Sequence, residues 1–282
     1  MVVETFRESL RLLGRMPILW IPGIICGLVA AALFILFNTA GAFFTSRIMI
    51  LSGLVVLIFI IGMIALIRDG TGDIRDLVRQ GIHYYFRVLL PLLVICFTLL
   101  VIFILLIVTF GFLGSTPDPG TIGVLTFCVM IPTLMLSFFF DMAAVYEDRK
   151  VFESIQRSIV LVSENAFEVI GFFVISALAG FSVFFGLMIV WEALLLEKLE
   201  PLATLYEQNQ TAFQELTPGQ FMGMIGTDGM WLTAVVIFLG FLILVPLLVS
   251  YKATFYRKLV GGTGETRQMT GEYDSKGRWY KY

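Results

Sequence analysis

Six long apolar segments constrain this chain more than any other feature of its sequence. Each is about as long as a helix must be to cross a hydrocarbon core of about 30 Å. They cover residues 16–37, 48–67, 88–112, 121–146, 166–191 and 231–256. Hydrophobic residues make up 59% of the chain and charged residues 14%, whereas about a quarter of a soluble protein is charged. The sequence therefore predicts an all-α, polytopic membrane helical bundle with six transmembrane helices.

An amphipathic segment precedes each pair of these spans. In residues 2–15 apolar side chains recur at spacings of three and four, and arginines occupy the opposite helical face. Residues 68–87 and 151–162 have the same design, which is typical of a helix lying in the headgroup plane. We therefore expect three repeats of interfacial helix plus helical hairpin, in one orientation. The predicted repeats cover residues 2–67, 73–146 and 150–256.

The connection between spans five and six, residues 192–230, is long and acidic. Within it, the run from Thr217 to Gln220 resembles a helix start, with a capping threonine, proline at the first position and glutamine at the third. This predicts a short helix that folds back over the bilayer surface or the bundle. Asn209 begins a glycosylation sequon. The polar residues 261–282 are expected to form a flexible tail after the membrane domain of residues 1–260.

Positive charge is distributed unequally between the two sides that six spans define. The N-terminus, the segments 68–87 and 147–165, and the end of the chain together hold 17 of the 19 Lys and Arg residues, and only Arg47 and Lys198 lie on the other side. Short loops rich in Lys and Arg stay in the cytoplasm. We therefore expect both termini in the cytoplasm, in a plasma (inner) membrane, with the acidic connection outside.

The arginines of the amphipathic segments are candidate contacts for anionic lipid headgroups. Each would contribute about 1 kcal/mol near an anionic surface. Ordinary topology determination would place the same charges there, so both interpretations stay open. The candidates are Arg7, Arg11, Arg15, Arg75, Arg79 and Arg157.

Asp141 and Lys252 lie inside apolar segments, near the same end of spans four and six. Ionisable residues within a membrane are costly and are functional candidates by default. We expect them to form an ion pair at the inner rim that couples the two helices. The alternative is that both side chains reach separately to the headgroups.

Small residues and prolines bear on how the spans pack. Gly23 and Gly27 form a GxxxG motif, which lets helices approach closely, although glycine-rich apolar chains also contain it by chance. Pro246 lacks an N–H and so frees the carbonyl of Leu242, and Pro132 does the same in span four. Such bends either line a cavity or simply fit helices together.

Several short segments resemble a known family. They are Phe6-x-x-Ser9 followed by Met16-Pro17-Ile18-Leu19, the Ser154 to Ser158 helix that runs into span five, and Thr254-Phe255-Tyr256 at the end of span six. These features are similar to the multi-span membrane domain attached to glycerophosphoryl diester phosphodiesterases, and to its stand-alone archaeal and bacterial relatives. The resemblance covers residues 2–260. It implies a membrane module and not a hydrolase, because the catalytic barrel has no counterpart here.

A direct search finds no nucleophile elbow, HExxH, Walker or dinucleotide-binding motif. We therefore expect no enzymatic activity, no cofactor, no metal and no nucleic-acid partner. The leading hypothesis is a membrane scaffold or lipid-associated module, whose partners are membrane lipids and, alternatively, another membrane protein. The rival is a small-solute or lipid transporter with a path between the repeats that Asp141 faces.

Overall fold

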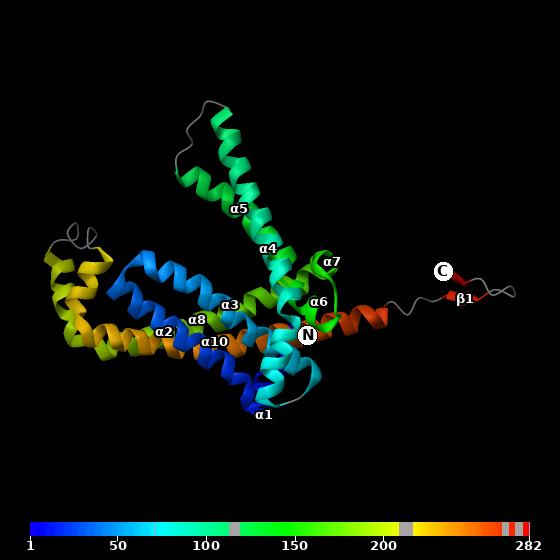
Figure 1. The fold of residues 1–282 in the computed structure, drawn as a ribbon, viewed down its shortest axis with the longest axis horizontal. Helices are drawn as coiled ribbons and strands as arrows, with labels where there is room; N and C mark the ends of the chain where they lie inside the picture. Colours follow the sequence, from blue (N-terminus) through cyan, green and yellow to red (C-terminus); the bar gives the residue numbers. More distant parts are fainter. Residues whose placement is uncertain (71, 113–118, 209–216, 267–270, 274–278, 282) are drawn as a thin grey trace. The chain divides into compact units, whose positions relative to one another are not determined.

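The computed structural model describes residues 1–70, 72–112, 119–208, 217–266, 271–273 and 279–281 (Figure 1). The elements in chain order are α1 (Val2–Arg15), the 3-10 helix η1 (Pro17–Trp20), α2 (Ile21–Ala40), α3 (Ala42–Asp69), α4 (Ile74–Phe112), α5 (Pro119–Ser137), α6 (Phe140–Tyr146), α7 (Val151–Glu164), α8 (Ala166–Gln208), α10 (Pro218–Thr266), β1 (Gly271–Tyr273) and β2 (Trp279–Lys281). The predicted sequon at Asn209 lies outside the described residues.

Six of the described helical segments are long and apolar enough to cross a membrane, which confirms the predicted all-α membrane architecture. They are Pro17–Ala40, Ala42–Asp69, Ile74–Phe110, Gly123–Tyr146, Ala166–Pro201 and Gly219–Gly261. The two short strands near the end of the chain pair with each other in antiparallel fashion.

Some helices run further than expected. Residues 74–87 of the predicted interfacial segment and span three form one helix, α4, which continues through Pro91. Helix α8 continues to Gln208, well into the predicted connection 192–230, where Leu, Glu and Ala favour helix. Helix α10 continues to Thr266, into the predicted tail.

The predicted helix start at Thr217 is present. Gln220 N–H donates to Thr217 Oγ1 (3.3 Å), and Thr217 N–H donates to Gln220 Oε1 (2.9 Å), which is a reciprocal cap. The short helix then breaks at Gly226, where φ is +70° and ψ is −177°. Glycine reaches this conformation at little cost because it has no Cβ. The short helix and the span that follows it are therefore separate segments within α10.

The described chain divides into two compact units, each built from separated segments. Unit 1 comprises Met1–Glu8, Phe86–Phe172 and Tyr251–Tyr282, and unit 2 comprises Ser9–Tyr85 and Phe173–Ser250. These boundaries do not follow the predicted repeat boundaries, and the three-repeat arrangement stays a prediction.

Unit 1 has an aromatic core. The Phe172 ring stacks on Tyr251 with centroids 4.6 Å apart and on Phe255 with centroids 4.8 Å apart, and Phe6 meets Tyr251 edge to face at 5.2 Å. Phe172, Tyr251 and Phe255 are buried. Such ring pairs add about 0.5–1.5 kcal/mol each beyond the area that they bury. The rings therefore join α1, α8 and α10 at the centre of this unit.

Unit 2 is held together by glycines at helix crossings. A Cβ on Gly23 would lie 2.6 Å from the Leu242 carbonyl oxygen, and one on Gly27 would lie 2.6 Å from the Phe238 carbonyl oxygen. The GxxxG motif of α2 is therefore a packing surface against α10. The crossing of α3 and α4 is closer still, because Gly62 faces the carbonyl of Leu77 across it.

We predict that Gly23→Leu and Gly27→Leu each destabilise the protein by about 1–3 kcal/mol, because the added side chain forces α2 away from α10. Gly53→Leu in α3 is the matched control, since a Cβ there meets nothing within 4 Å. The measurement is the melting temperature of each variant in lipid nanodiscs. Equal melting temperatures for all three variants would contradict close packing at the α2–α10 crossing.

Candidate functional site

Span four is broken near one end, and a serine from α7 repairs the break. Helix α5 ends at Ser137, whose Oγ donates to the Thr133 carbonyl (2.7 Å), and α6 begins at Phe140. Between them, Ser158 Oγ accepts from Phe139 N–H (2.9 Å) and donates to the Leu136 carbonyl (2.8 Å). Because the Ser158 side chain satisfies two backbone groups that the break exposes, the break carries little penalty.

Asp141 and Lys252 meet directly beside this break. Lys252 Nζ donates to Asp141 Oδ2 at 2.8 Å, and Asp141 Oδ1 accepts from Met142 N–H at 2.8 Å. Only 15% of the Asp141 side chain and 14% of the Lys252 side chain are exposed. The Lys252 ammonium also lies 4.1 Å from the ring centroid of Phe138. The structure thus brings these two candidate residues together and links α6 to α10.

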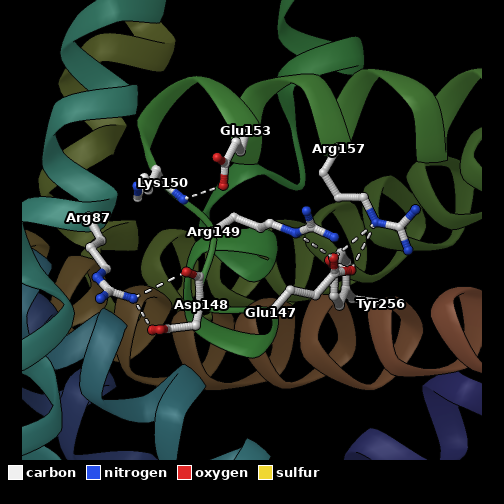
Figure 2. Close-up of polar contacts among 8 residues, drawn as sticks. All are labelled: Arg87, Glu147, Asp148, Arg149, Lys150, Glu153, Arg157 and Tyr256. Carbon is white, nitrogen blue, oxygen red and sulfur yellow. Dashed lines mark hydrogen bonds and ion pairs between the residues drawn. The ribbon is translucent and has the colours of Figure 1, made fainter.

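Glu147 is the centre of a larger network just after α6 (Figure 2). Tyr256 O–H donates to Glu147 Oε1 at 2.7 Å, and Arg157 Nε donates to the same oxygen at 2.9 Å and to Oε2 at 3.1 Å. Arg149 Nε donates to Glu147 Oε2 at 3.2 Å. One carboxylate therefore connects the turn after α6 with α7 and α10.

These contacts determine the charge state of the network. Burial alone would raise the pKa of Glu147, but the hydrogen bonds from Tyr256 and Arg157 outweigh it and hold this pKa below its ordinary value of 4.5. Burial would lower the pKa of Arg157, whereas the bond to Glu147 raises it above the ordinary value. Glu147 and Arg157 are therefore both charged at neutral pH.

The turn between α6 and α7 contains two further polar contacts, also drawn in Figure 2. Arg87 pairs with the carboxylate of Asp148 and donates to its carbonyl at 3.3 Å. Asp148 has a φ of +55°, in the left-handed region that aspartate tolerates better than most residues. Lys150 N–H donates to Glu153 Oε2 at 3.3 Å, which caps the start of α7.

Glu8 of α1 makes the other ion pairs of unit 1 that bear on the site. Arg257 Nη2 lies 2.6 Å from Glu8 Oε1, and Lys258 Nζ lies 3.0 Å from Oε2. The hydrogen bond from Lys258 lowers the pKa of Glu8 below 4.5. Glu8 thereby joins the start of the chain to the end of α10, within the same unit as the Glu147 network.

The six candidate headgroup contacts separate into two groups. Arg157 is bound to Glu147, so its guanidinium is used inside the protein. The other five are exposed, and among the described residues their guanidinium groups have no hydrogen-bond or ion-pair partner. These five free arginines are Arg7, Arg11, Arg15, Arg75 and Arg79.

Glu147, Tyr256 and Glu8 were not predicted from the sequence as members of the site. The available signal was the charged run from Glu147 to Lys150 directly after span four, which shows that charge gathers there but not how it pairs. Chemically, the arrangement places each of the carboxylates of Asp141, Glu147 and Glu8 against a cation. Its evident effect is to hold helix ends together. No group of three or more His, Cys, Asp or Glu in the described part of the chain is arranged to hold a metal ion.

We predict that Asp141→Asn and Lys252→Met each destabilise the protein by about 2–3 kcal/mol, because each leaves the other partner largely buried without its counter-charge. The double variant is expected to cost less than the sum of the two, since no unpaired charge remains. A double-mutant cycle on melting temperature measures this coupling. Additive losses would show that the two side chains act separately at the headgroups.

We also predict a specific acid sensitivity. Because the pKa of Glu147 is lowered in the folded protein, its contribution to stability is complete above about pH 4.5 and is lost as the pH falls below that value. Glu147→Gln should lower the melting temperature at pH 7 and flatten its decline between about pH 5 and 3. Glu192→Gln is the control, at an exposed position in α8. An acid profile that Glu147→Gln leaves unchanged would contradict the network.

Comparisons with known proteins assign the chain to a family, but they assign no function to it. The model of a domain of unknown function, DUF7847, matches residues 1–259, which include all six apolar helices. No curated protein and no solved structure matches the chain. Because the match covers nearly the whole sequence, the chain belongs to the DUF7847 family, whose function is unknown.

Proposed function

We propose that this protein is a non-enzymatic, multi-pass membrane module that associates with anionic lipid headgroups through the free arginines of α1 and α4. The observation that carries the proposal is that these arginines have no ion-pair partner among the described residues, although other cations of the chain do. Arg157, Arg257 and Lys252 all engage carboxylates. Cations left unpaired at a bilayer surface attract anionic lipid.

The side chains next to the free arginines support the same function. On α1, the exposed Val3 and Leu10 lie within one turn of Arg7, and on α4 the exposed Ile82 lies within one turn of Arg79. Exposed apolar residues interleaved with arginine are typical of a helix at a membrane interface. The resemblance to membrane domains attached to glycerophosphoryl diester phosphodiesterases favours a lipid environment as well.

The proposal includes a topology and a location. The excess of Lys and Arg on one side supports cytoplasmic termini in a plasma or inner membrane, where the inner leaflet carries the anionic lipids. The free arginines would then face that leaflet. A second membrane protein remains an alternative partner for the same surface.

We predict that Arg75→Ala/Arg79→Ala weakens the preference for anionic lipid by about 30-fold, because two arginines at about 1 kcal/mol each are lost. The measurement is native mass spectrometry of the protein released from nanodiscs with equal phosphatidylglycerol and phosphatidylcholine, with the retained lipids counted. Arg75→Lys/Arg79→Lys should keep most of the preference, since lysine keeps the charge.

Arg47→Ala is the matched control for this experiment. Arg47 lies on the other side by the charge rule, and its guanidinium carbon lies 3.5 Å from the ring centroid of Phe43. The Arg47→Ala change removes one positive charge, as each of the Arg75→Ala and Arg79→Ala changes does. Equal loss of anionic lipid in the Arg47→Ala and Arg75→Ala/Arg79→Ala proteins would refute the proposed surface.

A transporter is the second candidate, and the break in span four beside Asp141 favours it, because broken helices and intramembrane charges line pathways in transporters. Single cysteines placed along α5, α6 and the Gly219–Gly261 span distinguish the two functions. A continuous stripe of positions that a water-soluble thiol reagent reaches would support transport. Protection at every position within the apolar part of these helices would support the lipid-associated module.

A further inference from the structure

An apolar groove lies between α8 and α10 in unit 2. Its volume is about 670 Å³, within the usual range for a ligand site. Side chains of α8 such as Leu187 and Met188 form one wall, side chains of α10 such as Phe241 and Leu244 form the other, and Ile60 of α3 also lines it. All of these residues lie in segments that are long and apolar enough to span a membrane.

The groove offers nothing to a polar occupant. Trp191 and Thr233 bring the only nitrogen or oxygen among its lining side chains. Trp191 Nε1 donates to Thr233 Oγ1 at 2.9 Å, and Thr233 Oγ1 donates to the Gly229 carbonyl at 2.7 Å. Both polar groups are therefore already bonded. Water needs two to four polar partners in such a site, so the groove favours a hydrocarbon occupant.

The lining also argues against a transmembrane helix as the occupant. Within this unit, close helix contacts use pairs of glycines, as Gly23 and Gly27 do against α10. The groove contains one glycine, Gly240, and a Cβ there would already lie 3.4 Å from Leu187 Cδ1. The other lining residues are bulky apart from Thr233. A flexible chain can follow such a surface, whereas a second helix backbone could not approach it closely.

The length of the groove fits a lipid chain that lies along it. Its α10 wall runs from Thr233 to Val249, about 24 Å at about 1.5 Å per residue. One leaflet is only about 15 Å deep, half of a hydrocarbon core of about 30 Å. The groove is therefore longer than one leaflet is deep, and a chain of one leaflet fits within its length.

We infer that this groove is a binding site for one acyl chain of a membrane lipid, held lengthwise between α8 and α10. The inference rests on the proposed association with lipid but not on the free arginines, which belong to other helices. The occupant is recognised through hydrocarbon contact alone, because the polar groups of the lining are bonded to each other or to backbone.

The test uses the full chain in nanodiscs of phosphatidylcholine that contain a small fraction of phosphatidylcholine with a photoactivatable diazirine on its acyl chain. After illumination, peptide mass spectrometry locates the labelled residues. We expect label to concentrate on groove residues of α8 and α10, and Leu244→Trp, which fills the groove, to lose most of it. Gly240→Val is a second filling variant, in case Leu244→Trp does not fold.

Val235→Trp is the matched control, because Val235 is an exposed residue of α10 that does not line the groove, and it should keep the label. Label spread evenly over exposed helix faces, label unaffected by both filling variants, or crosslinks to a second protein would overturn the inference. The lipid used has no net charge. Groove labelling without any anionic preference in the arginine experiment would therefore refute the proposed headgroup function alone, and the reverse result would refute only the groove.

Discussion

A backbone inside a bilayer must find all its hydrogen bonds within the protein, and much of this structure follows from that requirement. Where span four breaks, Ser158 bonds to the two backbone groups of Leu136 and Phe139. Where Pro246 frees the Leu242 carbonyl, Gly23 brings α2 against that oxygen. Close approach at a glycine allows a weak Cα–H···O contact, which offsets part of the lost bond. Irregular backbone is thus placed where another helix can reach it.

Charge in this chain is divided between two uses. Asp141, Glu147 and Glu8 each bind a cation from α10 or α7 in unit 1, and the pairs of Asp141 and Glu8 connect segments that are distant in sequence. Removing water from a charge is costly, and a charge so placed is stable only with its partner. The five free arginines of α1 and α4 remain exposed to solvent or headgroups. An arginine such as Arg157 has a structural role because its guanidinium contacts a carboxylate of the protein. The free arginines contact no carboxylate among the described residues.

The spans could be predicted from sequence because the thickness of the hydrocarbon core sets their length. The helix start at Thr217 could be predicted because a helix cap depends only on residues that are close in sequence. The continuity of α4 from Ile74 into span three and the end of α8 at Gln208 could not be predicted, since nothing in a charged helix-forming segment marks where the membrane stops. For Asp141 and Lys252, their similar distances from the same end of spans four and six were enough to propose a pair. The Glu147 network was not predicted because Tyr256 is far from Glu147 in sequence and Arg157 lies in the next helix, so that only packing brings the three together.

Side-chain size on a membrane helix separates surfaces that bind helices from surfaces that bind lipid. Helix α10 shows both within unit 2. Its face toward α2 meets the backbone of Gly23 and Gly27, whereas its face toward α8 diverges and leaves bulky side chains around a groove. The hydrophobic effect does not distinguish the two faces, because lipid tails are as apolar as leucine. Packing distinguishes the two faces. The side chains around an unfilled groove lack dispersion contacts, which either a helix or a lipid chain can restore. With small residues absent from that side of α10 except at Gly240, the lipid chain is the occupant that can restore them.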